Sequence, residues 1–193
     1  AATRAYVHRS IFDQFVAGVS RVMDGMVLGD TSDEATDLGP LISRAQQQKV
    51  ADMVQRAVAD GATVACGGYI PDDLAEGSFY RPTLLIGATQ DSEIVQEEVF
   101  GPVLVALPFD TEDEALHLAN DTRYGLAASA WTNDVRLAHR AGHYRPGPDP
   151  QQRHRMHITI SSGAMTCVAG RWPVPGGCAA ARGHRPRPRA PLP

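Results

Sequence analysis

The sequence predicts an α/β fold with a mainly parallel sheet and flanking helices, and two observations carry this prediction. Segments with helical periodicity alternate with short apolar runs along residues 1–140. The run VLVALPF at 103–109 is apolar almost throughout, which is typical of a strand covered on both faces. Strands and helices that alternate in this order indicate βαβ units within one layered domain.

The first elements follow from apolar spacing and from capping residues. A helix is expected over residues 10–26, with Ser10 as its cap and apolar side chains at helical spacing. Ser43 caps a second helix, in which Gln46 occupies the capping-box position. Gly61 ends that helix, and the following ATVACGG predicts a short strand.

The later elements continue the alternation. FYRPTLLIGA at 79–88 predicts a strand, and DSEIVQEEVF at 91–100 a short helix or turn. Thr111 and Glu114 form a capping box at the start of EDEALHLAN, which predicts a helix. LAASAWT predicts a strand with Trp131 in the core, and NDVRLAHRA predicts a final helix.

The charges and prolines divide the chain in two near residue 140. Residues 1–140 hold 10 Lys and Arg against 21 Asp and Glu, a net charge of −11, and 5 of the 14 prolines. Residues 141–193 hold 8 Arg and a single acidic residue, a net charge of +7, and the other 9 prolines. We therefore interpret 1–140 as the folded part and 141–193 as a basic Pro/Arg/Gly-rich tail that is disordered or out of frame.

Composition also limits the compartment. No apolar run approaches the ~20 residues that a membrane helix needs, so no membrane association is expected. Three widely spaced cysteines argue against a disulfide framework and a zinc cluster. The first residues, AATRAYVHRS, match neither a signal peptide nor an initiator Met start. We expect a cytoplasmic chain, and one interpretation is that it is not a complete gene product.

Several motifs together resemble the NAD(P)-dependent aldehyde dehydrogenases. EEVFGPV at 97–103 is followed by PFDTEDEALHLANDTRYGLAASAWT, in which every motif stands in the family order. The similarity extends back through YRPTLLIG, VACGG, GDTSDEATDLGPLIS and AATRAYVHRSIFDQF. It covers about residues 1–140, which implies part of an aldehyde dehydrogenase catalytic domain.

The resemblance implies four cofactor-binding residues for NAD or NADP. Glu98 would accept hydrogen bonds from the hydroxyls of the nicotinamide ribose, and Phe100 would lie against the nicotinamide ring or its ribose. Gln46 and Lys49 occupy positions that approach the adenosine ribose. Two alternatives stay open, because Gln46 also suits a capping box and Lys49 suits an exposed helix surface. Glu97 is interpreted as a solvated charge at a helix end.

No catalytic residue and no metal ligand is assigned within the chain. In the family a cysteine thiolate attacks the aldehyde, a glutamate acts as general base, and an asparagine amide stabilises the oxyanion. By resemblance the nucleophile would fall about two residues before Ala1, and the other groups further upstream. Cys66 is interpreted as buried and inert, while Cys167 and Cys178 lie where the resemblance has ended. His8, His117 and His139 lack a second ligand at metal spacing.

Residues 141–193 depart from the family pattern. Their Arg, Pro, Gly, Ala and His content is typical of GC-rich codons translated in another frame, so we hypothesise a frameshift near residues 140–145. HITIS at 157–161 is the stretch that could form a transient strand. A functional basic tail that binds nucleic acid is the alternative, and the lack of interleaved aromatic residues disfavours it.

Three functional hypotheses follow. The first is a fragment of an oxidoreductase that oxidises a small-molecule aldehyde to a carboxylate with NAD(P)⁺, inactive as this chain alone. The alternative is a non-catalytic interaction module that docks on an acidic partner or a full-length homologue, because the family forms homodimers or homotetramers. The third, an acyl-phosphate reductase, fits EEVFGPV and YGLAA less well.

Overall fold

The 193-residue chain is described by a computed structural model that covers residues 3–124, 127–132, 134–137 and 140, with the strand backbones of 155–160 and 166–169. Within this part of the chain, seven strands form one sheet: β1 (Arg4–His8), β2 (Thr63–Cys66), β3 (Thr83–Ile86), β4 (Val103–Phe109), β5 (Ala127–Thr132), β6 (Arg155–Ile160) and β7 (Thr166–Ala169). The α-helices are α1 (Phe12–Gly25), α2 (Arg44–Ala59), α3 (Glu93–Gln96) and α4 (Glu112–Asn120), and 3-10 turns span Arg9–Ile11 and Asp72–Leu74. No helix among the described residues is both long and apolar enough to cross a bilayer.

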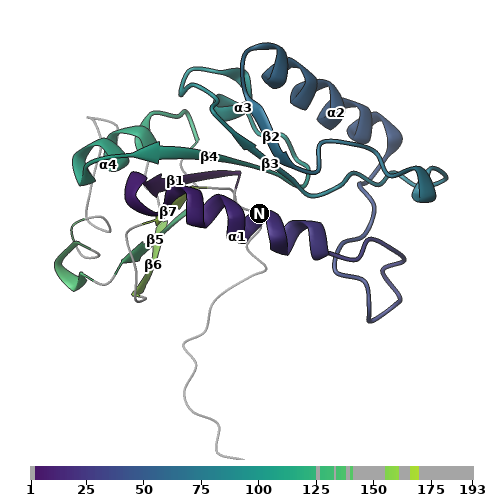
Figure 1. Cartoon of the computed structure of the whole chain (residues 1–193), viewed down its shortest axis with the longest axis horizontal. Helices are drawn as coiled ribbons and strands as arrows, with labels where there is room; N and C mark the ends of the chain where they lie inside the picture. Colours follow the sequence, from purple (N-terminus) through teal and green to yellow (C-terminus); the bar gives the residue numbers. More distant parts are fainter. Residues whose placement is uncertain are drawn as a thin grey trace, which may run out of the picture.

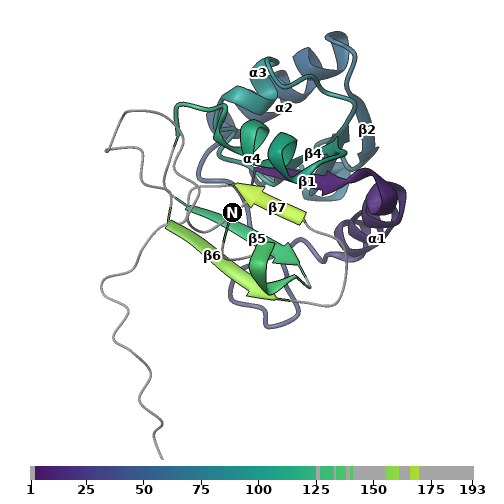
Figure 2. The same ribbon diagram turned by 90° about the vertical axis from the view of Figure 1, so that its left-hand side faces the viewer.

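The sheet is mixed, and most of its strands share one direction. The strand order is β2-β3-β4-β1-β7-β5-β6 (Figures 1 and 2). β3, β4 and β1 pair in parallel, as do β5 and β6. The antiparallel pairs all involve β2 or β7. The expected α/β fold with a mainly parallel sheet and flanking helices is therefore confirmed.

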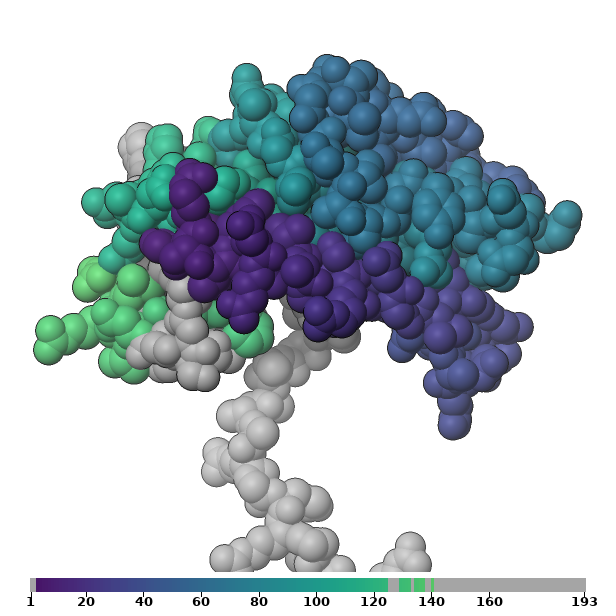
Figure 3. All heavy atoms as spheres, in the orientation of Figure 1, coloured from purple at the N-terminus to yellow at the C-terminus, as the bar shows by residue number. Residues whose placement is uncertain are grey.

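Helices cover both faces of the sheet. α2, α3 and α4 contribute to the larger core on one face, where they pack with alternate residues of β4 such as Val105 and Phe109. α1 lies on the other face against Leu84 and Ala106. This second layer is thin, because no residue of α1 is fully buried. Figure 3 shows the N-terminal segment as a purple band on the surface.

The helix boundaries agree with the capping signals at two helices and differ at the first. Ser43 and Thr111 cap α2 and α4 as predicted: the Ser43 hydroxyl accepts from the Gln46 N–H at 3.1 Å. Ser10 does not cap α1, because it lies inside a 3-10 turn that precedes the helix. The His8 ring caps this 3-10 turn, and its Nδ1 accepts from the Ser10 N–H at 3.2 Å, while α1 itself has no side-chain cap.

One strand was missed by the sequence analysis, and one expectation about a strand residue is corrected. β1 was not among the predicted strands, because Arg4 and His8 enclose only three uncharged residues in the sequence. The Arg4 side chain is nevertheless buried, with a residue exposure of 5%. Trp131 is 42% exposed rather than in the core, since its neighbour Ala130 points inward and side chains alternate along a strand.

β6 and β7 lie within the segment that was expected to be a disordered tail. β6 includes residues 157–160 of the HITIS stretch, and its backbone pairs in parallel with β5. β7 pairs antiparallel to both β1 and β5. The backbones of these ten residues pair with β1 and β5, which supply partners for their backbone groups, as the possible strand at HITIS had suggested for 157–160. The rest of the predicted tail, like the His139 position, lies outside the described residues.

Candidate functional site

The loop between α3 and β4 carries the EEVFGP motif. α3 ends at Gln96, where the Glu97 N–H still donates to the Glu93 carbonyl at 2.8 Å. β4 begins at Val103, and the Val103 N–H donates back to the Gly101 carbonyl at 2.8 Å. The six residues 97–102 therefore make a tight connection at the N-terminal end of β4.

Phe100 adopts a backbone conformation that side chains rarely take. Its φ is +51°, the one positive φ at a non-glycine residue in the described part of the chain. This left-handed region costs a bulky residue roughly 1–2 kcal/mol. The ring gains little burial in return, because Phe100 is 57% exposed. A strained backbone that presents an apolar ring to solvent indicates a functional position.

Gly101 lets the loop rest directly on α2. A Cβ at this position would lie 2.6 Å from Cγ2 of Val50, which is fully buried and β-branched. Such a distance is well inside van der Waals contact, and a buried valine has no rotamer freedom with which to move aside. The glycine is therefore required by the close approach of the loop to the helix.

The side chain of Gln46 holds the loop from α2. Its Nε2 donates to the carbonyls of Val99, at 2.9 Å, and Phe100, at 3.2 Å. The expected capping-box function of this side chain is corrected: Ser43 caps the helix, while the Gln46 amide bonds a loop 53 residues further along. Two carbonyls at a tight turn need donors, and this amide supplies both hydrogen bonds.

The other predicted cofactor residues lie around the same loop. Lys49 is exposed on α2, one turn after Gln46 and so on the same side of the helix. The hydrogen bond from Arg56 is the main effect that lowers the pKa of Glu93, and the positive charge of Lys49 lowers this pKa slightly further. Glu98 is half-buried between Glu97 and Val99. The structure thus brings Gln46 into contact with the Phe100 backbone and places Lys49 and Glu98 on the adjoining helix and loop.

Glu97 is held by two residues that the sequence analysis did not single out. Arg123 forms an ion pair with its carboxylate, and the Tyr124 hydroxyl donates to Glu97 Oε2 at 3.0 Å. The Arg123 guanidinium also lies 5.1 Å from the centre of the Tyr124 ring. The hydrogen bond to Tyr124 and the charge of Glu97 both raise the pKa of Arg123. Glu97 is a helix-end charge as interpreted, with a side chain that is 39% exposed, and the structure adds its pairing with Arg123 and Tyr124. RY within TRYGLAA was the signal that could have been used.

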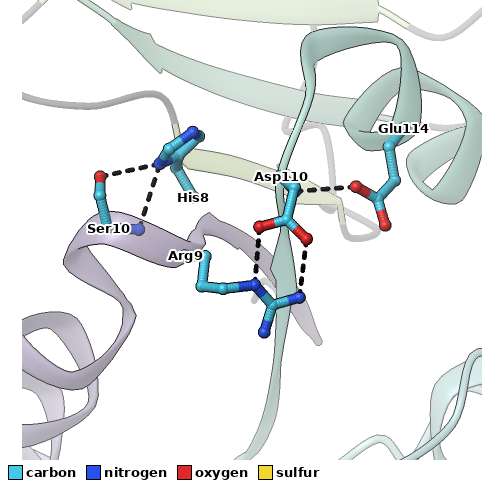
Figure 4. A network of polar contacts seen from close by, with 5 residues as sticks. All are labelled: His8, Arg9, Ser10, Asp110 and Glu114. Carbon is cyan, nitrogen blue, oxygen red and sulfur yellow. Dashed lines mark hydrogen bonds and ion pairs between the residues drawn. The ribbon is translucent and has the colours of Figure 1, made fainter.

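A second polar network lies at the opposite end of β4. Arg9 binds the Asp110 carboxylate through two hydrogen bonds of 2.6 and 2.9 Å, and the Asp110 N–H donates to Glu114 at 2.8 Å. His8 and Ser10 form the adjoining turn (Figure 4). All of these residues except the half-buried His8 are exposed, they join β1, β4 and α4, and none has a positive φ.

Among the described residues, the cysteine side chain is buried and no group of side chains could hold a metal ion. Cys66 is 7% exposed, and its Sγ lies 3.8 Å from the sulfur of Met23, so it is buried as predicted. No group of three or more His, Cys, Asp or Glu residues in this part of the chain could hold a metal ion. The Cys167 side chain and Cys178 lie outside the described residues.

Solved structures define the class to which this fold belongs. An aldehyde dehydrogenase from Bacillus cereus, solved as an NAD⁺ complex, matches with a TM-score of 0.72 and 34% identity, over 82% of this chain and 30% of that one. Apo betaine aldehyde dehydrogenase from Staphylococcus aureus matches with a TM-score of 0.74 and 36% identity over the same shares. The aldehyde dehydrogenase fold is therefore common to both.

The family model agrees with the structural match. The model of the aldehyde dehydrogenase family matches residues 1–144, and the chain belongs to this family. Family membership, with the NAD⁺ complexes among the solved relatives, confirms the expectation that NAD(P) is the cofactor by family.

Curated relatives show how much of a family member the chain represents. A 2-hydroxymuconic semialdehyde dehydrogenase from Pseudomonas putida is 45% identical over 148 residues, which are 75% of this chain and 30% of the relative. A betaine aldehyde dehydrogenase from Agrobacterium fabrum is 45% identical over 139 residues, 72% of this chain and 28% of the relative. The matched region thus spans less than a third of these relatives.

Proposed function

We propose that the loop 97–102 binds the nicotinamide end of NAD(P)⁺ in an enzyme that oxidises an aldehyde to a carboxylate. The observation that carries the proposal is Phe100, which is exposed in a strained conformation and held there by hydrogen bonds from α2. Family membership supports the reaction class and the cofactor.

Each residue of the loop has a task that suits its chemistry. The Glu98 carboxylate can accept hydrogen bonds from two vicinal ribose hydroxyls, which orients the sugar. The exposed Phe100 ring offers an apolar surface to the flat nicotinamide or its ribose. Lys49, exposed on α2, adds a positive charge on the side from which a dinucleotide phosphate or ribose would approach. When bound, the cofactor supplies a hydride acceptor, and the loop fixes where that acceptor lies.

A substitution of Glu98 that keeps its size but removes its negative charge tests the proposal. The experiments use an active aldehyde dehydrogenase that contains residues 1–140 of this chain, called the natural protein below. In it, Glu98→Gln should raise the KM for NAD⁺ by roughly 10- to 100-fold, since hydrogen bonds to a charged group are worth about 1.5–3 kcal/mol. Glu112→Gln is the matched control, because Glu112 lies on α4, away from the loop, and pairs with Arg140. Equal KM values for the two variants would refute the assignment of Glu98.

We also propose that the 193-residue chain by itself does not turn over aldehyde. Support comes from the described cysteine, Cys66, which is packed against Met23 within the second core of the sheet and is therefore not accessible to a substrate. Aldehyde-dependent NADH formation by the purified chain, above a blank without aldehyde, would contradict this proposal.

A homodimeric or homotetrameric assembly of the natural protein is proposed on family grounds and is measurable by light scattering.

The division of the chain near residue 140 also stays a proposal. It is supported by the charge split and by a family match that extends to residue 144. Resequencing the coding DNA through codon 150 in all three frames tests whether a family-like sequence continues in another frame. An intact frame, with no such sequence, would refute the frameshift.

A further inference from the structure

We propose that Gln46 is a positioning residue, which acts on the cofactor through the backbone of Phe100, and that Arg123 and Tyr124 anchor the other end of the same loop. The inference rests on the proposed function of residues 97–102. It assigns Gln46 a role that differs from the direct ribose contact implied by the resemblance.

The amide nitrogen of Gln46 already donates to the loop. Its nitrogen donates to two consecutive carbonyls, those of Val99 and Phe100, at 2.9 and 3.2 Å. These carbonyls flank the rotation that gives Phe100 its positive φ of 51°. A donor shared by both carbonyls holds their relative orientation, and therefore favours the left-handed conformation over an extended one.

The second anchor fixes the residue on the other side of Glu98. The Glu97 carboxylate pairs with Arg123 and accepts from the Tyr124 hydroxyl at 3.0 Å. Glu98 therefore lies between two held positions, the side chain of Glu97 and the carbonyl of Val99. A carboxylate that must meet two ribose hydroxyls together gains from such preorganisation, because little loop ordering is left to occur on binding.

Sequence distance strengthens the inference. Gln46 lies 53 residues before Val99, while Arg123 lies 26 residues after Glu97. Two separate elements, α2 and the segment before β5, thus converge on one short loop. At the other end of β4, the Arg9–Asp110 pair holds an unstrained turn, so the combination of strain and clamping is confined to residues 97–100 in the described part of the chain.

Hydrogen exchange without cofactor isolates the clamp. In the natural protein, Gln46→Ala should speed amide exchange in residues 98–101 by ~10-fold, because the loop then opens locally. Gln48→Ala is the matched control: Gln48 lies on the same helix, is exposed, and donates to Asp52 at 2.7 Å rather than to the loop. Alanine preserves helix propensity, and circular dichroism confirms that each variant is folded.

A glycine at position 100 supplies a second, independent test. Glycine adopts positive φ without strain, so in a Phe100→Gly background the effect of Gln46→Ala on exchange should shrink to less than ~3-fold. A direct ribose contact by Gln46 predicts no such coupling, since no ribose is present. With NAD⁺, Gln46→Ala should raise KM by roughly 5- to 20-fold and leave kcat within about 2-fold, as expected for lost preorganisation of binding.

The results separate the inference from the proposed function. Faster exchange in Gln46→Ala with coupling to position 100 supports the clamp, even if Glu98→Gln fails to change the KM for NAD⁺. Unchanged exchange in Gln46→Ala overturns the clamp, even if Glu98 binds the ribose. A KM change without an exchange change would assign Gln46 to direct contact and likewise overturn it.

Discussion

The two ends of strand β4 are both rich in polar contacts, yet they differ in what those contacts hold. At the N-terminal end, Gln46 and Arg123 hold a loop whose Phe100 has a φ of +51° and is 57% exposed. At the C-terminal end, Arg9 and Asp110 hold an unstrained turn beside the start of α4 (Figure 4). The same kinds of interaction thus hold an exposed Phe100 ring in place at one end and join neighbouring elements at the other.

This difference shows which observations point to a functional site. A network of exposed charges contributes little to stability and marks no site by itself. Backbone strain at a bulky residue is costly, and it persists only where the surroundings fix the conformation. Cofactor binding should therefore respond to substitutions in the loop at the N-terminal end of β4 and not to those at the C-terminal end, whereas stability can change at either end.

The largest expected effect is at the buried C-terminal end. Phe109 is 1% exposed and packs edge-on against the His8 ring, with centroids 5.5 Å apart. Phe109→Ala should lower the free energy of unfolding by about 3–5 kcal/mol, because it leaves a large cavity in the main core. Denaturant unfolding of the natural protein measures this effect. The KM for NAD⁺, taken where the variant is folded, should not change; a rise above about 5-fold, the lower end of the effect expected for lost preorganisation, would break the comparison.

The next effect is at Gly101. Gly101→Ala should destabilise by about 1–3 kcal/mol, since its Cβ would meet Val50 Cγ2 at 2.6 Å in a packed core. Gly18→Ala is the control, because Gly18 is inside α1 and a Cβ added there would have nothing within 4 Å. That control should stabilise by about 0.5–1 kcal/mol. If both glycines responded alike, the close approach of the loop to α2 would not be the cause.

A smaller effect of opposite sign is expected at Phe100. Phe100→Gly removes the left-handed strain, so the free energy of unfolding should rise by about 0.5–1 kcal/mol while the affinity for NAD⁺ falls. Thermal unfolding and NAD⁺ titration of the natural protein measure the two quantities. Phe100→Ala separates the causes, because it keeps the strain and loses the ring. A loss of stability in Phe100→Gly would contradict the strain argument.

The smallest effect is expected at the Arg9–Asp110 pair, which is exposed. The hydrogen bond and charge of Arg9 hold the pKa of Asp110 below its usual value. The pair therefore stabilises the fold above about pH 4, the pKa of an unfolded aspartate, and this contribution is lost as pH falls through the lower folded pKa. A double-mutant cycle with Arg9→Ala and Asp110→Ala should give a small coupling at neutral pH, and this coupling should disappear as pH falls through the lowered folded pKa of Asp110. A coupling that grew on acidification would contradict this assignment.

The fold was largely predictable from the sequence because its periodic signals are local. The capping residues Ser43 and Thr111 and the apolar run of β4 were sufficient to place α2, α4 and the central strand. β1 escaped prediction because a buried Arg4 stands at its start, and pattern reasoning assigns charged residues to the surface. The pairing of β7 between β1 and β5 is a long-range contact that no local pattern encodes.

The site was predictable only in part. The motif EEVFGP led to the prediction of Glu98 and Phe100 by resemblance, which stays a prediction, and α2 was correctly expected to begin beside Gln46. The donation from Gln46 to the loop and the pairing of Glu97 with Arg123 depend on tertiary distances between elements far apart in the chain. The positive φ of Phe100 is equally invisible in sequence, because left-handed backbone is expected at glycine or asparagine and not at phenylalanine.

The most direct test of the central claim is a crystal structure of the natural protein with NAD⁺ bound. We expect the Glu98 carboxylate to lie within about 3 Å of the nicotinamide ribose hydroxyls, with the Phe100 ring against the nicotinamide or its ribose and Gln46 still bonded to the Phe100 carbonyl. A dinucleotide whose nicotinamide ribose lies away from residues 97–102 would contradict it, whatever the stability measurements show.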